Sequence, residues 1–325
     1  MASYQSILLT GGAGFVGSYL APLIAADYPL AARRALTLSS EAQALDNGFE
    51  PVCGDILDAE RIDAIIEELR PDLVLHLAGQ ASIGKALGAA ETTWRVNFHG
   101  SFNLASALAR HASEALLLFA SSASVYGESL LDGPATETTA LRPLDAYGRS
   151  KAAAEAALFD VLPAQARLIV ARPVNHSGPR QNEKSFVLAS FAAQIAAIEA
   201  GRAEPRLLVG DLSKARDFLD VRDVVEAYRL LVTHADQLDA RSVFNVASGE
   251  PRIISDLLEG LKRRAKRPFA IETDASLLRP PSVDIATVAC DASKLAAATG
   301  WRPRHSMDDL LQSLLDHWRE KEARA

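Results

Sequence analysis

The chain has 325 residues, of which 49% are hydrophobic and 23% charged, and its formal net charge at pH 7 is −7. This length allows a large core and suggests two domains, and the composition is that of an ordinary globular protein. The acidic excess argues against a general attraction to nucleic acid or to an anionic membrane surface, so neither is expected as a partner. No run approaches the ~18 apolar residues of a membrane span.

The start of the chain and its cysteines predict a cytoplasmic location. The first predicted strand begins close to Met1, which leaves no room for a signal peptide. Cys53 and Cys290 suggest neither a disulfide framework nor a paired metal motif, and we expect reduced thiols. The seven histidines lack the spacing of metal ligands, so the sequence predicts no metal site.

Residues 7–17 read ILLTGGAGFVG, a short apolar strand that runs into a glycine-rich turn and then a helix. Such a turn places unpaired N–H groups and the positive end of a helix dipole together, an arrangement that binds a pyrophosphate. Gly11 suits the tight turn, Gly14 the close approach of phosphates and Gly17 close helix packing. Gly12, Gly14 and Gly17 also fit the G-x-G-x-x-G spacing, so both assignments stay open. The predicted cofactor-binding residues here are Gly11, Gly14, Phe15, Val16 and Gly17.

The next predicted strand, residues 35–39, bears on the choice of cofactor. In NAD-specific folds of this kind, an acidic residue ~20 positions beyond the glycines binds the ribose hydroxyls. Here the strand ends in Ser39 and Ser40, with no acid before Glu41. This end tolerates a 2′-phosphate, and the two serines can donate to it, so NADP(H) is favoured and NAD(H) remains possible. Arg33 and Arg34 precede the strand and are expected at its far end.

Two further strand ends are predicted to reach the same cofactor. Residues 49–52 form a strand followed by Gly54, Asp55 and Ile56. Asp55 either reads the amino edge of adenine or caps a helix that begins near Ala59. Residues 72–77 read as a buried parallel strand that leads into small residues suited to passing beside a cofactor. The segment 91–110 is predicted to be helical and carries Asn97, which is either functional or a polar residue on a packed helix.

Hydroxyl groups cluster where the strand 116–120 ends. It opens into Ser121, Ser122 and Ser124, and the carboxyl ends of strands in a doubly wound sheet face the ligand crevice. Tyr147 and Lys151 are four residues apart on a predicted helix and therefore project from one face. An adjacent ammonium favours the phenolate, which would make Tyr147 a usable proton donor or acceptor near neutrality.

These motifs resemble the extended short-chain dehydrogenases/reductases of the nucleotide-sugar epimerase/dehydratase group. TGGAGFVG, Asp55-Ile56, HLAG at 76–79, the serine four before Tyr126, and the pair Tyr147 and Lys151 match in order over essentially the whole chain. The resemblance implies that Ser122 bonds the reacting oxygen, Tyr147 is the acid/base, and Lys151 holds the ribose. The remaining cofactor-binding residues predicted on this basis are Ser39, Ser40, Asp55, Ile56, Leu77, Ala78, Gly79, Asn97, Tyr147, Lys151 and Pro173.

The second half of the chain carries the predicted substrate contacts. Residues 170–179 read VARPVNHSGP, and by resemblance Pro173 lies near the nicotinamide while Asn175 and His176 face the sugar nucleotide. A guanidinium group can donate two parallel hydrogen bonds to phosphate oxygens, so Arg216 and Arg279 are the candidates for binding the diphosphate. The predicted substrate-binding residues are Ser124, Asn175, His176, Arg216 and Arg279.

Three reactions share this scaffold. Dehydration needs an acid after the strand-end serine, where this chain has Ala123 and Ser124, so a 4,6-dehydratase is disfavoured. The motifs are most similar to those of enzymes acting on GDP-mannose-derived sugars, although LRPP with Ser282 departs from the usual LRPSD. We therefore expect an NAD(P)H-dependent reductase of a nucleotide-linked 4-keto-6-deoxy sugar, with GDP-4-keto-6-deoxy-D-mannose favoured. The alternatives are a 4-epimerase with tightly bound NAD and a dinucleotide sensor without turnover.

The predicted architecture is α/β. Residues 1–172 plus 213–247 are expected to form a Rossmann doubly wound parallel sheet that binds the dinucleotide. Residues 173–212 plus 248–325 are expected to form a smaller α/β domain that binds the nucleotide sugar, with the site between the two. A homodimer through the helices around Asn97 and Lys151 is also expected from the resemblance.

Overall fold

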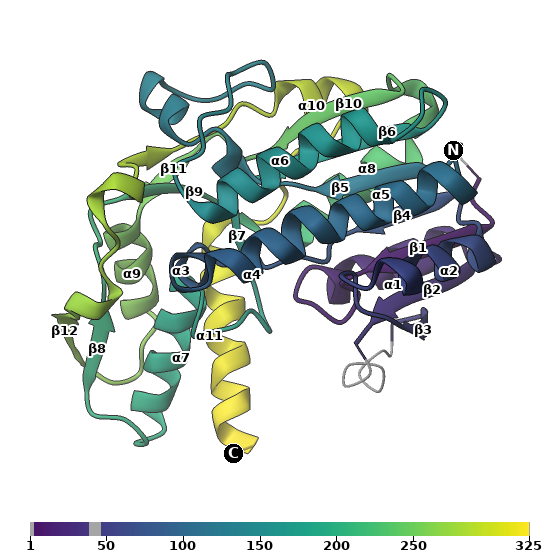
Figure 1. Cartoon of the computed structure of the whole chain (residues 1–325). Coiled ribbons are helices and arrows are strands. Elements are labelled where there is room, and N and C mark those ends of the chain that lie inside the picture. The colour runs from purple at the N-terminus through teal and green to yellow at the C-terminus, as the bar shows by residue number, and fades with distance from the viewer. Residues whose placement is uncertain (1–2, 39–46, 325) are drawn as a thin grey trace.

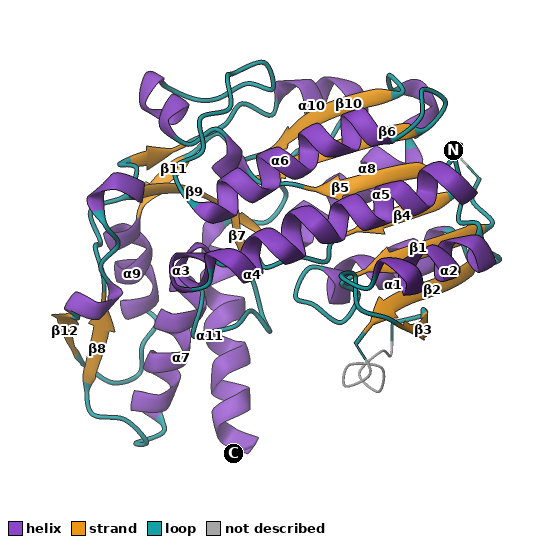
Figure 2. Ribbon diagram, in the orientation of Figure 1, coloured by secondary structure: helices purple, strands orange, loops and turns teal. Residues whose placement is uncertain are grey.

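A computed structural model describes residues 3–38 and 47–324 of the chain and shows a central parallel sheet flanked by helices (Figure 1, Figure 2). The sheet has seven strands in the order β10-β6-β5-β4-β1-β2-β3, all of them parallel. The strands are β1 (Ser6–Thr10), β2 (Ala32–Thr37), β3 (Glu50–Cys53), β4 (Leu73–His76), β5 (Leu116–Ala120), β6 (Arg167–Pro173) and β10 (Arg241–Val246). The predicted α/β doubly wound sheet is confirmed.

Helices cover both faces of this sheet, which explains why its inner strands are mostly apolar, with polar residues such as Thr10, His76 and Arg172 near their carboxyl ends. One buried cluster joins the sheet to α2 (Ala59–Leu69), α5 (Gly100–His111) and α6 (Ala146–Val161). A second joins the opposite face to α1 (Gly17–Asp27), α8 (Val221–Thr233) and α10 (Ser293–Thr299). Local sequence sets the helix ends: Asp58 accepts a hydrogen bond from Arg61 N at 3.0 Å and caps α2.

A third buried cluster lies beyond the carboxyl end of the sheet. It is built on α7 (Val187–Glu199), α9 (Ile254–Lys262) and α11 (Met307–Arg324), with the parallel pair β8 (Arg206–Val209) and β12 (Ala270–Thr273). Between it and the main sheet, β9 (Ala215–Asp220) pairs with β7 (Asn175–Ser177), β11 (Pro251–Ile253) and β13 (Thr287–Val288). The assignment of dinucleotide and sugar binding to the two predicted domains stays a prediction.

Two predicted segments differ from the structure. Strand β2 begins at Ala32, so Arg33 and Arg34 lie within it, and Arg34 pairs with Glu50 of β3 at 2.7 Å. The predicted helix 91–110 is α4 (Ala90–Trp94), a π-helical turn η2 (Arg95–His99) and then α5. The short helix α3 (Ile83–Gly88) precedes them.

No helix in the described ranges is long and apolar enough to cross a membrane.

A buried histidine fixes the π-helical turn against the ends of β1 and β4. Ser101 Oγ donates to the Asn97 carbonyl at 2.6 Å, so it must accept from His76 Nε2 at 2.9 Å. His76 Nδ1 then accepts from the Thr10 hydroxyl at 2.7 Å, and Thr10 Oγ1 in turn accepts from Ala78 N at 3.1 Å. The ring is therefore neutral, with its proton on Nε2, and both nitrogens are used.

Because His76 is buried and neutral, we predict that the folded state loses stability in acid. Burial, aided by the charge of Lys151, lowers the pKa of His76 from 6.5 to about 3. Between these values the unfolded state binds one more proton than the folded state, so stability rises with pH, by up to about 1.4 kcal/mol per pH unit. We expect His76→Asn to flatten the dependence of unfolding free energy on pH between about 6.5 and 3, as measured by urea unfolding. Exposed His99→Asn is the control, and an unchanged slope in His76→Asn contradicts this interpretation.

Candidate active site

The carboxyl ends of β1, β4, β5 and β6 open into one cavity of about 740 Å³, which β7, β9 and the start of α7 also line. Most of the predicted site residues lie on its wall. They are Gly11, Gly14, Phe15, Val16, Gly17, Asp55, Ile56, Leu77, Ala78, Gly79, Ser122, Ser124, Tyr147, Lys151, Pro173, Asn175, His176, Arg216 and Arg279. Asn97 is fully buried behind this wall, and Ser39 and Ser40 lie outside the described residues.

The glycine-rich turn forms one end of the cavity. Gly11 has a positive φ of 73°, and a Cβ there would lie 2.8 Å from Ala78 N. A Cβ on Gly17 would lie 2.8 Å from Gly12 Cα, so the helix can approach the turn only with glycine at this position. A Cβ on Gly14 would meet only Gly11 O, at 3.1 Å. Helix α1 begins here without a side-chain cap, so its positive end fits a pyrophosphate.

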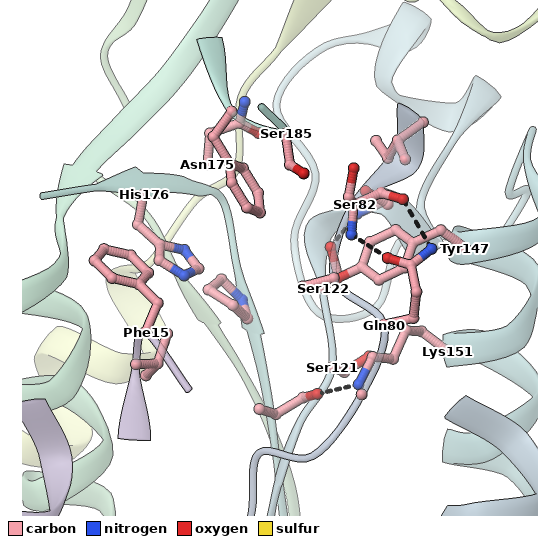
Figure 3. Close-up of a pocket in the computed structure, with 18 of the residues that line it drawn as sticks. Phe15, Gln80, Ser82, Ser121, Ser122, Tyr147, Lys151, Asn175, His176 and Ser185 are labelled. Atoms are coloured by element: carbon pink, nitrogen blue, oxygen red, sulfur yellow. Dashed lines mark hydrogen bonds between the residues drawn. The ribbon is translucent and has the colours of Figure 1, made fainter. Parts of the chain in front are cut away.

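The hydroxyl, phenol and ammonium predicted to act in catalysis lie together on the opposite wall (Figure 3). Ser122 follows β5, and its Oγ accepts from Ser124 N at 3.1 Å. Asp145 caps α6 by accepting from Gly148 N at 2.8 Å, which places Tyr147 in the first turn and Lys151 in the next. Lys151 Nζ donates to the Ala120 carbonyl at 2.8 Å. All three side chains are buried.

The protonation of this group differs from expectation. Burial raises the pKa of Tyr147, with a lowering contribution from the Ser122 hydroxyl and a raising one from Asp145. Burial also lowers the pKa of Lys151 from 10.5 to about 8, against the raising effect of Glu155. The spacing of Tyr147 and Lys151 predicted a lowered phenol pKa, because sequence spacing carries no information on desolvation. The phenol keeps its proton at neutral pH and is a proton donor.

The charges on the wall favour an anionic ligand. Among the lining residues that the structure describes, the carboxylates are Asp55 and Asp145, and the cations are Lys85, Lys151, Arg216 and Arg279. Asp55 accepts from Leu57 N at 2.9 Å, and Asp145 caps α6. The alternative role for Asp55, as the cap of α2, is wrong, because Asp58 caps that helix. No group of three or more His, Cys, Asp or Glu among the described residues could hold a metal ion.

The two predicted arginines are held differently. Arg216 is buried and donates to Asp284 Oδ1 at 2.8 Å and to the Ala215 carbonyl at 2.9 Å. Burial lowers its pKa from an ordinary value of 12.5, with Asp284 opposing this effect. Arg279 is exposed at the rim of the cavity. A ligand would therefore meet one fixed and one adaptable guanidinium.

His176 and Phe15 form the wall that faces Ser122, Tyr147 and Lys151 (Figure 3). Their rings stack with centroids 6.2 Å apart and an interplanar angle of 6°. His176 Nδ1 lies 3.0 Å from the Val174 carbonyl, which can only accept, so Nδ1 carries a proton. Burial lowers the pKa of His176. The ring is therefore neutral, and its Nε2 is a hydrogen-bond acceptor.

Several polar residues on the wall were not predicted from the sequence. The Gln80 amide donates to the Ser82 carbonyl at 2.9 Å and to Thr93 Oγ1 at 3.1 Å. Gln80 directly follows the HLAG motif at residues 76–79, and this position could have marked it as a residue of the site. Ser185 Oγ is buried without a hydrogen-bond partner among the described residues. Tyr228 of α8 also lines the cavity and comes from the face of the sheet opposite α6. No motif marks either of them.

Comparisons with known proteins agree with this geometry. GDP-6-deoxy-D-mannose reductase of Pseudomonas aeruginosa is 34% identical over 321 residues, which are 98% of each chain. The solved structure of RMD from Pseudomonas aeruginosa complexed with NADPH has a TM-score of 0.79 and 32% identity, covering 98% of this chain and 100% of that one. UDP-glucose 4-epimerase from Thermotoga maritima with UDP-glucose has a TM-score of 0.82 and 27% identity, covering 97% and 99%.

A family profile extends the likeness over most of the chain. The profile described as GDP-mannose 4,6 dehydratase matches residues 8–314. That range contains the glycine turn, the serine-rich end of β5 and the Tyr147–Lys151 helix, all of which line the one cavity. The chain belongs to the GDP-mannose 4,6 dehydratase family, within the epimerase/dehydratase group of short-chain dehydrogenases/reductases.

Proposed function

We propose that the chain is an NADPH-dependent reductase of a nucleotide-linked 4-keto-6-deoxy sugar, with GDP-4-keto-6-deoxy-D-mannose as the favoured substrate. One observation carries this proposal. Ser122, Tyr147 and Lys151 share one wall of the cavity, whereas each of the two lining carboxylates of the described chain accepts a hydrogen bond from a nearby backbone N–H. Reduction of a ketone needs one proton donor, while dehydration needs additional acid and base groups.

The relatives support the same choice. The reductase of Pseudomonas aeruginosa covers 98% of this chain at 34% identity, and the related solved structure holds NADPH. The serine pair predicted to favour a 2′-phosphate agrees with that cofactor. A cytoplasmic location belongs to the proposal, because Cys53 and Cys290 are both free thiols, as a reducing compartment allows.

The cavity fits a nicotinamide dinucleotide. Residues 11–17 and the positive end of α1 would hold the pyrophosphate, and Lys151 would hold a ribose. When bound, the cofactor supplies the hydride. Tyr147 then donates its phenolic proton to the oxygen on C4 of the sugar, and Ser122 donates a hydrogen bond that stabilises the negative charge developing there. The raised pKa of the Tyr147 phenol suits the reduction of a ketone, because the phenol is protonated when the reaction begins.

The opposite part of the cavity would hold the nucleotide sugar. Arg216 and Arg279 would bind the diphosphate, one as a fixed donor and the other as an adaptable one. Ser124, Asn175 and His176, with its acceptor nitrogen, line the same cavity and would contact the sugar. The proposal keeps residues 173–212 plus 248–325 as the sugar-binding domain and residues 1–172 plus 213–247 as the dinucleotide domain.

A homodimer completes the proposal. Trp94, Phe98 and Phe102 follow one another at four-residue intervals from the end of α4 through η2 into α5, with successive ring centroids 6.1 and 6.3 Å apart. Phe102 is 41% exposed, and α6 lies beside α5 on the same side of the sheet (Figure 1). Trp94 and Phe98 are half-buried, so a partly exposed aromatic row lies beside a second helix and suits burial against another copy of the chain.

The activity is tested by mixing the purified chain with GDP-4-keto-6-deoxy-D-mannose and following the loss of NADPH absorbance. We expect turnover with NADPH, and lower kcat/KM with NADH. A thermal-shift panel of GDP-, UDP-, dTDP- and CDP-sugars checks the nucleotide. Interconversion of two sugars without net NADPH loss, with cofactor retained through gel filtration, would instead indicate the 4-epimerase, and binding of cofactor without turnover of any ketosugar would indicate a sensor.

Removal of the proton donor gives a sharper test. We expect Tyr147→Phe to lower kcat by on the order of a hundredfold or more, because reduction then lacks its acid. NADPH affinity, measured by fluorescence titration, should change much less than kcat, because the glycine turn and Lys151 still bind the cofactor. Tyr4→Phe, which removes a phenol at the far end of the fold, is the control and should keep full activity. Equal kcat in Tyr147→Phe and the unaltered chain contradicts the assignment.

The oligomeric state is tested by sedimentation at micromolar concentration. We expect the unaltered chain to have twice the monomer mass and Phe98→Glu/Phe102→Glu to be monomeric, because two carboxylates in an apolar interface are costly to bury. Leu30→Glu, at a residue that is 94% exposed away from these helices, is the matched control and should remain dimeric. A monomeric unaltered chain rules out this interface.

A further inference from the structure

A buried ion pair lies directly behind the catalytic wall and lines no part of the cavity. Arg172 Nη2 lies 2.5 Å from Glu155 Oε2, and Arg172 Nε donates to Glu155 Oε1 at 3.0 Å. The two side chains are only 6% and 4% exposed. Neither residue carries a role in the reaction as described so far. Replacing such a pair by apolar residues is often neutral or stabilising, so stability alone does not account for it.

The pair is bonded to the strand that carries the catalytic serine. Ser121 Oγ donates to Glu155 Oε1, and Ser121 immediately precedes Ser122. Arg172 Nη1 also donates to the Tyr126 hydroxyl at 3.0 Å. That hydroxyl donates in turn to Asn245 Oδ1 of β10 at 2.6 Å. The network therefore joins β5, α6, β6 and β10 through one buried charge pair.

Each partner of the pair is fixed next to a residue of the cavity wall. Glu155 follows Lys151 by one turn of α6 and so lies on the same helix face. Arg172 immediately precedes Pro173, which lines the cavity at the end of β6. We infer that Glu155 and Arg172 are positioning residues that hold Ser122, Lys151 and Pro173 in register and keep the Lys151 ammonium charged.

The charge part of this inference follows from what surrounds Lys151. The ammonium donates to the Ala120 carbonyl and lies 4.7 Å from the centroid of the Phe119 ring. His76 of β4 and Tyr147 of α6 are both uncharged at neutral pH. Glu155 is the group that raises the Lys151 pKa, against burial. Without that carboxylate the ammonium loses its proton at a lower pH.

The test measures NADPH affinity from pH 6.5 to 9.5 by fluorescence titration, because this part of the inference rests on the proposed cofactor contact of Lys151. Affinity should fall as the pH rises through the Lys151 pKa. We expect Glu155→Gln to move the midpoint of this fall down by about one pH unit. With the ketosugar, kcat should fall on the order of tenfold while KM changes little.

Glu199→Gln is the matched control, because Glu199 of α7 pairs with Arg319 of α11 and its side chain is only 8% exposed. It should leave the midpoint unchanged. Should Glu155→Gln fail to fold by circular dichroism, Glu155→Met/Arg172→Met removes the pair without leaving an unpaired charge and should also show a downward shift, smaller because the cation Arg172 is removed with the carboxylate. An unaltered midpoint in the folded variant overturns the inference. Absence of NADPH binding by the unaltered chain instead overturns the proposed function.

Discussion

The site depends on an ammonium group held out of water. Lys151 is 4% exposed, its Nζ donates to a backbone carbonyl of β5, and it makes no direct contact with a carboxylate among the described residues. Burial of a cation without a counter-ion is costly, and the pKa of about 8 expresses that cost. Three neighbouring groups reduce this cost. His76 is neutral, the Phe119 ring lies beside the ammonium, and the Glu155 carboxylate lies one helical turn away.

The acid/base groups that line the cavity suit a reductase better than a dehydratase. The family is described by a dehydration, yet Ala123 and Ser124 follow Ser122, the proposed catalytic serine. Both lining carboxylates of the described residues accept hydrogen bonds from backbone N–H groups. What remains near the catalytic wall is a protonated phenol and a hydroxyl. Such a site can protonate an oxygen but has no second acid/base pair with which to remove water from a sugar.

Local pattern was sufficient to predict the parallel sheet, the glycine turn and the grouping of Tyr147 with Lys151, because each depends on residues close together in sequence. The direction of the Tyr147 pKa could not be predicted, because desolvation depends on what the fold packs around the ring. Glu155 and Arg172 were missed for the same reason: they lie on a helix and a strand that only the tertiary fold brings together. Gln80, Ser185 and Tyr228 belong to no motif, and the π-helical turn at Arg95–His99 interrupts what reads as one helix.

The contacts between α1 and the segment after β7 bear on the order in which ligands bind. Phe15 belongs to the turn that would receive the pyrophosphate, and its ring stacks on His176. One turn further, the Tyr19 hydroxyl donates to the Pro179 carbonyl at 2.9 Å, and the Arg180 guanidinium lies 4.4 Å from the Tyr19 ring centroid. A dinucleotide bound at this turn would therefore also stabilise the His176 wall, which is the proposed contact of the sugar nucleotide. From these contacts we would expect the dinucleotide to bind before the ketone.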